Sequence, residues 1–338
     1  MAGLDTLVVN AGSTSLKLSV VGEDDASRAV ASLAEAGDVD AVAHRIVHGG
    51  PRLHEPVVID DEVRAELAQA TELAPLHNTP ALAAVDEARA ELPDVPHVAV
   101  FDTAFHATIP KEASTYAVPA RWREQLGIRR YGFHGLSVAW AAERVPVPRL
   151  VVCHLGGGCS VTAVRDGRSV DTTMGFTPLE GVPMATRPGS IDPEILLFLL
   201  RHGSETPESL EHALEHESGL LALGGTTRVD ELQASDAPGA RLALEVFCYR
   251  VATAVGAMAT ALGGVDALVF TAGIGEGSAF VREQVCARLG FLGVRLDPAA
   301  NAAAEPDADV AAEGSDVRVR VVHAREDVVA ARAARALL

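Results

Sequence analysis

The sequence is short of basic residues relative to acidic ones. It contains 28 Lys and Arg against 46 Asp and Glu, which gives a formal net charge of −18. Nucleic acids and anionic membranes both reward clustered Lys and Arg, so this charge argues against either as a partner. A small anionic substrate would therefore need a local cationic pocket.

Cysteine and long apolar runs are also scarce. The chain has only four cysteines, which form no Cys-x-x-Cys pair: Cys153, Cys159, Cys248 and Cys286. The first residues lack a basic start followed by an apolar run, and no uninterrupted apolar run reaches the ~18 residues of a membrane span. We therefore expect a cytoplasmic protein with reduced thiols and no contact with a membrane.

The length of the chain favours two domains. It has 338 residues, whereas single hydrophobic cores stop growing near ~250–300 residues. Hydrophobic residues make up 48% of the chain and charged residues 22%, which is ordinary for a globular protein with a sizeable core.

Two segments share one pattern, in which a Gly/Ser-rich reversal joins two apolar strands: Asn10-Ala-Gly-Ser-Thr-Ser-Leu-Lys17 and His154-Leu-Gly-Gly-Gly-Cys-Ser-Val161. Glycine lets the main chain approach a ligand closely, so that successive N–H groups converge on an anion. A tight β-turn explains one such cluster without any ligand. Two copies in one chain favour two phosphate loops.

The rest of the pattern indicates strands followed by helices in each half. We expect strands over residues 7–9, 16–20, 97–101, 150–154, 160–164, 169–172, 267–271 and 317–323, and helices over 240–262, 280–289 and 326–338. The loop 272–277 before a helix is another place for a nucleotide. Residues 298–315 read as a solvated surface segment without a function.

A few polar residues stand in unusual surroundings. Arg45 and Arg187 lie among apolar, Gly and Pro residues, and Asp102 follows a buried strand. His134 lies in a segment that must bend sharply, where a satisfied core histidine is the alternative to a catalytic one. His44 and His48 have the i, i+4 spacing of a metal pair, but the segment reads as a strand entering a turn.

Together, these motifs resemble the acetate and propionate kinase family. The matching blocks follow one another along nearly the whole chain: 10–17, 44–50, Leu76-His77-Asn78, Phe101-Asp-Thr-Ala-Phe-His106, 131–135, 174–193 and 271–276. The resemblance implies an α/β, duplicated actin-like (ribonuclease H-like) ATPase fold with two domains and a central cleft. It also implies a homodimer, and transfer of phosphate from ATP to a short carboxylate, in line and with Mg²⁺.

The resemblance also assigns roles to residues. Arg45 and Arg187 would hold the carboxylate and the moving phosphoryl group, with His134 donating to that group and Asp102 and Glu326 holding magnesium, Asp102 directly or through water. Asn10 and Lys17 would contact phosphate or metal-bound water. The acyl group would lie among Val47, Leu76, Phe133 and Pro178, and the nucleotide against His154, Gly156, Gly157, Gly158, Gly273, Ile274 and Gly275.

The chain departs from the family pattern in several places. Gly157 and Gly277 stand where the family usually has Asn, and the Asp-x-Arg pair of the adenosine site is out of register in Gly224-Gly-Thr-Thr-Arg-Val-Asp-Glu231. The stretch between Lys17 and His44 is much shorter than in relatives. The C-terminal Thr-Asn-Glu-Glu block reads Ala324-Arg-Glu-Asp327.

These departures leave three hypotheses open. The first is an acetate kinase that uses ATP. The second is a kinase for another short carboxylic acid, or one that uses pyrophosphate or another nucleotide as donor. The third is a non-catalytic nucleotide-binding relative. We expect residues 1–105 and 325–338 to form the first domain, closed by the C-terminal helix, and residues 106–324 to form the second.

Overall fold

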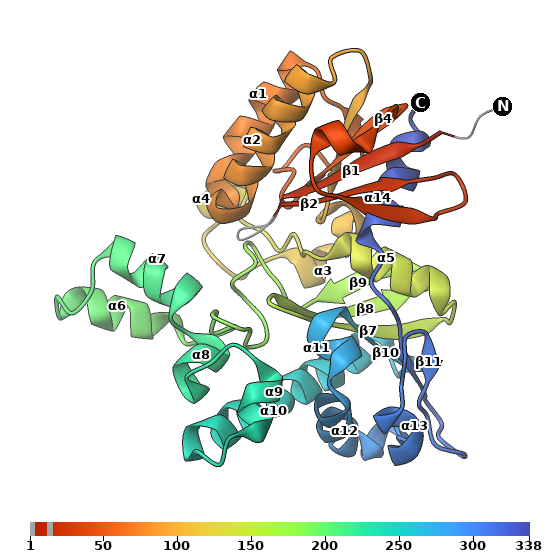
Figure 1. Ribbon diagram of the computed structural model, residues 1–338. Helices are drawn as coiled ribbons and strands as arrows, with labels where there is room; N and C mark the ends of the chain where they lie inside the picture. The colour runs from red at the N-terminus through yellow and green to blue at the C-terminus, as the bar shows by residue number, and fades with distance from the viewer. Residues whose placement is uncertain (1–3, 12–15) are drawn as a thin grey trace. The chain divides into compact units, whose positions relative to one another are not determined.

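The structure, a computed structural model that describes residues 4–11 and 16–338, divides into two compact units (Figure 1). Unit 1 comprises Met1–Ala107, Ala117–Trp140 and Arg325–Leu338, and unit 2 comprises Thr108–Tyr116 and Ala141–Ala324. Residues 117–140, which we assigned to the second domain, thus cluster with unit 1. The division falls inside helix α5 (Gly135–Arg144).

Unit 1 is built on a six-stranded sheet in the order β3-β2-β1-β4-β6-β5. The strands β1, β4 and β6 run parallel, whereas β2 and β3 continue antiparallel from β1, and β5 pairs antiparallel with β6. Every residue of β6 is buried, as expected for a central strand covered on both faces. The strands are β1 (Thr6–Ala11), β2 (Leu16–Val21), β3 (Ser27–Val30), β4 (Ala41–Ile46), β5 (Val57–Val58) and β6 (His97–Phe101).

Helices cover both faces of this sheet. The helices α1 (Asp61–Ala70) and α2 (Pro75–Glu91) pack their apolar residues on one face, and α14 (Glu326–Arg335) packs against β1, β4 and β6 on the other (Figure 1). Asp60 fixes the start of α1, because its carboxylate accepts from the Val63 N–H at 2.8 Å. Shorter elements are η1 (Leu33–Ala36), η2 (Thr71–Leu73), η3 (Ala104–Thr108) and α4 (Ala120–Gln125).

The sheet of unit 2 has the order β11-β12-β10-β7-β8-β9. Read from its other edge, this order repeats that of unit 1 strand for strand, with β9, β8 and β7 in the places of β3, β2 and β1, and β10, β12 and β11 in the places of β4, β6 and β5. The strands β7, β8 and β9 form the antiparallel meander, β7, β10 and β12 run parallel, and β11 pairs antiparallel with β12. Their bounds are β7 (Arg149–Leu155), β8 (Cys159–Arg165), β9 (Arg168–Thr172), β10 (Ala267–Thr271), β11 (Ala308–Asp309) and β12 (Arg318–Val321). This duplication confirms the expected actin-like fold.

The main helix of unit 2 is α10 (Pro238–Leu262), which packs on β7, β8 and β9. It is long and apolar enough to cross a membrane, but 50% of its most apolar window is buried in the protein, as in a core helix. The helix ends at Gly263, which adopts φ 72°. The remaining elements are α3 (Lys111–Ser114), α6 (Pro193–Arg201), α7 (Pro207–His216), α8 (Gly219–Gly224), α9 (Val229–Ala234), α11 (Ala272–Gly277), α12 (Ala279–Ala287), η4 (Gly290–Leu292) and α13 (Pro298–Ala302).

One local expectation was wrong, because residues 272–277 form the short helix α11 and not a loop. The expected surface segment 298–315 is mostly exposed or half-buried, but it contains α13 and β11. The glycines of residues 272–277 predict a loop, but a contact with the distant residue Ala324 holds these residues in a helix. Asn301 in α13 is 3% exposed, so this part of the segment belongs to the core.

Candidate active site

In unit 1, three polar residues meet where the parallel strands end. Asn10 on β1 pairs with Arg45 on β4, and Asp102 directly follows β6. Because β1, β4 and β6 are parallel neighbours, their carboxyl ends share one edge of the sheet, where ligands bind in open α/β folds. The structure thus brings together residues that are far apart in the sequence.

Arg45 is the centre of this group. Its Nε and Nη2 donate to the two carboxylate oxygens of Asp102 at 2.8 and 2.5 Å, and its Nη1 donates to Asn10 Oδ1 at 3.0 Å. A guanidinium has five N–H groups, so two are left over after these three bonds to the described residues. The Asp102 side chain is 1% exposed and that of Arg45 is 15% exposed. The guanidinium is therefore fixed in orientation and still able to bind an anion.

Glu326, the first residue of α14, lies beside the same guanidinium. Its Oε2 is 3.9 Å from Arg45 Nε. Burial raises the pKa of Glu326, and Asp102 adds to this effect, whereas Arg45 and Lys17 act in the opposite direction. For Arg45, burial opposes the charge, but the Asp102 and Glu326 carboxylates outweigh it and raise the pKa. Two carboxylates and two cations thus share this edge of unit 1.

His134 is held next to Asp102 by an unusual backbone. It adopts φ 60°, a conformation that costs a non-glycine residue about 1–3 kcal/mol. The following residue, Gly135, donates its N–H to the Asp102 carbonyl at 2.9 Å, and a Cβ on Gly135 would lie 2.2 Å from that oxygen. This close approach requires glycine, and it fixes His134 at the start of α5.

The proposed acyl residues of unit 1 lie around His48. Val47 and Phe133 are 4% and 1% exposed, and the ring of His48 meets the Phe133 ring edge-on at 5.5 Å. Asn78, to which sequence reasoning gave no role, accepts from the His48 N–H at 3.2 Å and donates to its carbonyl at 2.9 Å. The side chain of Leu76 lies outside the described part of the structure.

In unit 2, the second glycine loop lies against α11. A Cβ on Gly156 would lie 3.6 Å from Ala272 Cβ and 3.9 Å from Gly273 N, so these two glycine-rich segments are neighbours. His154, the residue before the last of β7, pairs with Thr271 at the end of β10. Among the described residues, a Cβ on Gly157 would meet no heavy atom within 4 Å beyond its neighbours in the chain. The corresponding loop of unit 1, residues 12–15, lies outside the described residues.

Glu276 and Arg282 hold α11 in place. One carboxylate oxygen of Glu276 accepts from the N–H groups of Ala272 and Ala324, both at 2.9 Å. Arg282, which is 2% exposed, donates to the carbonyls of Gly275 and Glu276 at 3.0 and 2.6 Å. Sequence reasoning missed Arg282, because its contacts with the α11 carbonyls and with Asn301 are what distinguish it from a surface arginine.

Arg187 in unit 2 is joined to the acyl candidate Pro178. Its Nη1 donates to the Pro178 carbonyl at 2.8 Å, and its Nε lies 3.9 Å from Glu215 Oε2. Burial lowers the pKa of Arg187, and Glu215 partly offsets this. Gly219 permits the packing, because a Cβ there would lie 2.8 Å from the Arg187 carbonyl oxygen.

The residues of unit 1 suit a magnesium ion that keeps several of its waters. Mg²⁺ takes one or two carboxylates together with water and phosphate oxygens, and Asp102 and Glu326 supply two carboxylates. Among residues 4–11 and 16–338, no three His, Cys, Asp or Glu side chains gather in a way that could hold a metal by themselves. The donor set therefore fits an ion that arrives with a nucleotide.

Comparisons with known proteins agree with this geometry. The model of the acetokinase family matches residues 28–332. The acetate kinase of Nostoc punctiforme is 47% identical over 302 residues, which cover 86% of this chain and 74% of that protein. The acetate kinase of Protochlamydia amoebophila is 43% identical over 310 residues, covering 89% and 78%.

Solved structures give the same result. A propionate kinase from Francisella tularensis superposes with a TM-score of 0.93 at 31% identity, covering 99% of this chain and 100% of that one. The acetate kinase of Porphyromonas gingivalis superposes with a TM-score of 0.87 at 30% identity, covering 99% of both chains. The chain belongs to the acetokinase family.

Proposed function

We propose that this protein makes acetyl phosphate and ADP from acetate and ATP by direct in-line transfer. Membership of the acetokinase family makes it a kinase that transfers phosphate to a carboxylate. The observation that carries the proposal is the guanidinium of Arg45, which Asp102 and Asn10 orient while two of its N–H groups remain. An oriented cation of this kind suits a carboxylate or a phosphoryl oxygen.

The reaction requires positioning and charge stabilisation more than acid–base chemistry. A carboxylate oxygen of acetate forms a bond to the γ-phosphorus of ATP while the bond from that phosphorus to the ADP oxygen breaks. Acetate is already ionised near neutral pH, so no proton has to be removed from it. Charge spreads over the equatorial oxygens of the moving group, which fixed cations stabilise.

We assign these cationic roles to Arg45 and Arg187, with His134 donating to the moving phosphoryl group. Arg187 uses one N–H on the Pro178 carbonyl, which leaves others for an anion. His134 occupies a strained backbone position beside Asp102, and such positions are concentrated at functional sites. Lys17 pairs with Asn10 across β1 and β2 and adds positive charge near Glu326.

Magnesium is part of the proposal. Glu326 and Asp102 would hold the ion, Asp102 directly or through water, with Asn10 contacting a metal-bound water. When bound, the ion would neutralise charge on the phosphate oxygens. Two carboxylates, Asp102 and Glu326, lie beside the same guanidinium, and this pair supports a cation there.

The nucleotide would bind in unit 2. We assign its phosphates to His154 and Gly156, Gly157 and Gly158, and its remaining contacts to Gly273, Ile274 and Gly275. The close approach of Gly156 to Gly273 supports one site made by both segments. ATP is the proposed donor. The changed adenosine motifs and Gly277 make pyrophosphate and other nucleotides the alternatives to test.

The acid is proposed to lie among Val47, Leu76, Phe133 and Pro178. A single methylene group in an apolar pocket changes binding by only about 1–3 kcal/mol. The strong likeness to a propionate kinase makes propionate the second candidate. If neither acetate nor propionate is phosphorylated, the substrate is another short acid or the protein binds without turnover.

We also propose a homodimer in which a second copy covers α6. None of the residues of α6 is buried, and this helix extends away from the sheet of unit 2 with α7 (Figure 1). Five large apolar side chains on or just before it are 38–51% exposed: Ile191, Ile195, Leu197, Phe198 and Leu200. Light scattering should give twice the chain mass, and Leu197→Asp with Phe198→Asp should give the monomer mass. A monomeric wild type would contradict the dimer.

A cytoplasmic location completes the proposal. All four cysteines are free and buried, which agrees with a reducing compartment. Its test is fractionation of the producing cells, where the protein should be recovered with the cytoplasmic enzymes.

The test of the function is a hydroxamate assay for acyl phosphate. It is run with Mg²⁺, with ATP, GTP and pyrophosphate as donors, and with acids from formate to butyrate. We expect the highest kcat/KM with ATP and acetate. A higher value with another pair would replace the substrates, and binding without turnover of any pair would favour the non-catalytic hypothesis.

A further inference from the structure

Two of the places where this chain departs from the family pattern contact one another. Arg325 belongs to the altered block Ala324-Arg-Glu-Asp327, where the family has Asn at this position, and Asp25 lies in the shortened stretch between Lys17 and His44. The Nη2 of Arg325 donates to the Asp25 carbonyl at 2.9 Å. The turn after β2 is thereby connected to the residue next to Glu326.

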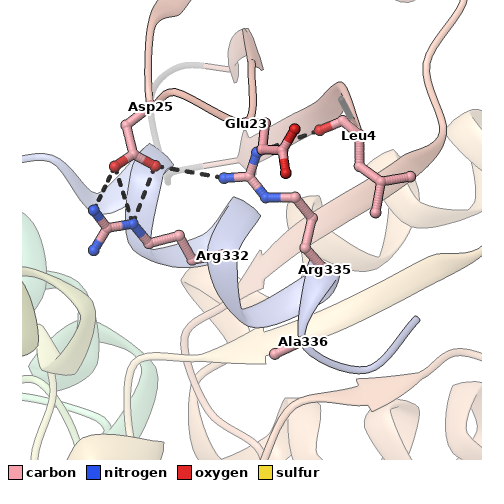
Figure 2. Close-up of a pocket in the computed structure, with 6 residues that line it drawn as sticks. All are labelled: Leu4, Glu23, Asp25, Arg332, Arg335 and Ala336. Carbon is pink, nitrogen blue, oxygen red and sulfur yellow. Dashed lines mark hydrogen bonds and ion pairs between the residues drawn. The ribbon is translucent and has the colours of Figure 1, made fainter. Parts of the chain in front are cut away.

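The carboxylate of Asp25 receives further arginines from the same helix. Arg332 Nε lies 3.0 and 3.1 Å from its two oxygens, and Arg335 Nη2 lies 3.5 Å from Oδ1. Figure 2 shows these side chains converging on Asp25 in a depression also lined by Leu4, Glu23 and Ala336. The hydrogen bond from Arg332 lowers the pKa of Asp25, which keeps the carboxylate ionised.

The turn is shaped to present Asp25 to these arginines. Asp25 adopts φ 64°, a left-handed conformation in which Asp and Asn are enriched. Its N–H donates to the Gly22 carbonyl at 3.0 Å, and Arg335 Nη1 donates to the same carbonyl at 2.7 Å. The contacts therefore fix both the backbone and the side chain of the turn.

These contacts reach both ends of α14. Arg325 precedes its first residue, and Arg332 and Arg335 lie in its last turn. The guanidinium of Arg332 also lies over the Trp140 ring, 5.5 Å from its centre. A helix held at both ends has little freedom to slide or tilt, so its first side chain keeps a defined position.

We propose that Asp25 is a positioning residue, which acts through Arg325 and α14 to hold Glu326 in place for a divalent cation bound with the nucleotide. This inference rests on the proposed function, because it takes Glu326 as the metal-binding carboxylate. In this chain the turn after β2 would supply an anchor for α14.

The test measures cation binding directly. Free Mn²⁺ is followed by electron paramagnetic resonance while the protein is titrated in the presence of ADP, for wild type, Asp25→Asn and Arg325→Asn. Asn suits the left-handed turn and preserves the fold while it removes the charge. We expect about tenfold weaker Mn²⁺ binding for both variants, the scale of a lost supporting partner. Hydrogen exchange at the N–H groups of residues 327–330 should also become faster.

Glu23→Gln is the matched control, because it removes one negative charge from the same depression and should leave Mn²⁺ binding unchanged. Mn²⁺ affinity and exchange rates in Asp25→Asn that equal those of wild type would overturn the proposal, even if the melting temperature falls. Glu326→Gln separates the metal role of Glu326 from the anchoring of α14 by Asp25. If it leaves Mn²⁺ binding unchanged, the metal role of Glu326 fails, whereas faster exchange in Asp25→Asn would still show the anchoring of α14.

Discussion

Arg45 and Arg187 are both buried cations, but their surroundings differ. The carboxylate of Asp102 compensates Arg45 through two hydrogen bonds, whereas the side chain of Arg187 meets, within the described part of the chain, a carbonyl at 2.8 Å and a carboxylate 3.9 Å away. A less compensated cation gains more when an anion arrives. Arg187 is therefore the residue whose charge should matter most for the moving phosphoryl group.

Replacement of Arg187 tests this role. Arg187→Ala should lower kcat by about 10³-fold, the scale of an arginine that stabilises the phosphoryl group. The measurement is the initial rate of hydroxamate formation at saturating substrates. Arg288→Ala, at the exposed end of α12, is the control and should keep the wild-type kcat. A kcat of Arg187→Ala within a few-fold of wild type would exclude the proposed role.

The raised pKa of Glu326 predicts a pH dependence for magnesium. Protons compete with the ion for this carboxylate, and burial moves the competition above the ordinary range of Glu, near pH ~4.3. The Mg²⁺ concentration for half-maximal activity should therefore rise as the pH is lowered from neutral across the acidic range in which the protein stays folded. A half-maximal concentration that stays constant over this range would contradict a metal-binding role for Glu326.

At the scale of elements, a substitution in the glycine loop between β7 and β8 can change nucleotide binding without changing the stability of the fold. A Cβ on Gly157 would meet no atom of the described residues within 4 Å beyond its neighbours in the chain, whereas one on Gly135 would lie 2.2 Å from the Asp102 carbonyl. An alanine at position 157 would place its methyl group in open space. An alanine at position 135 would push the start of α5 away from the residue that follows β6.

Gly157→Ala and Gly135→Ala should therefore differ in kind. The first should keep the melting temperature and raise the KM for ATP, because the methyl group occupies space proposed for phosphate. The second should lower both the melting temperature and kcat. Calorimetry and steady-state kinetics measure these effects. If Gly157→Ala leaves the KM for ATP unchanged, the loop does not bind the nucleotide phosphates.

The strands and the residues at their ends could be predicted from sequence, whereas contacts between distant segments could not. Apolar runs located β6 and β7, and the polar residue after β6 identified Asp102, whereas the role of His154 came from the family resemblance. Glycine content predicted a loop at 272–277, but Glu276 and Arg282 hold these residues in a helix and connect it to Ala324 and Asn301. The anchor between Asp25 and α14 joins opposite ends of the chain, so no local pattern contains it.

For the whole molecule, buried histidines predict how stability depends on pH. Burial lowers the pKa of His44 to about 3 and that of His106 to about 4. Both stay neutral in the folded protein at pH 5, whereas in the unfolded chain they bind protons below pH ~6.5. Their contribution to stability is therefore complete above pH ~6.5 and is lost as the pH falls toward their folded pKa values.

Each histidine should cost about 2 kcal/mol of stability at pH 5 relative to pH 8. Glu326 works in the opposite sense, because its raised pKa means that the folded state holds a proton more tightly than the unfolded chain. We expect urea unfolding to show a lower free energy at pH 5 than at pH 8. A free energy of unfolding that is constant or higher at pH 5 would contradict neutral buried histidines.

The two units share one fold but carry different side chains at equivalent positions. Asn10 and His154 each lie near the end of the first strand of their sheet, and each pairs with the parallel neighbour, Arg45 in unit 1 and Thr271 in unit 2. Unit 1 thus carries charged groups suited to the acid and the metal. Unit 2 carries glycine-rich backbone suited to the nucleotide phosphates.

The most direct test of the central claim is phosphorus NMR of the enzyme with Mg²⁺, ATP and acetate labelled with ¹⁸O in both carboxylate oxygens. Direct attack predicts acetyl phosphate and ADP in equal amounts, with one ¹⁸O bonded to the phosphorus of the product. Consumption of ATP to ADP and unlabelled inorganic phosphate, without acetyl phosphate, would contradict transfer to the carboxylate.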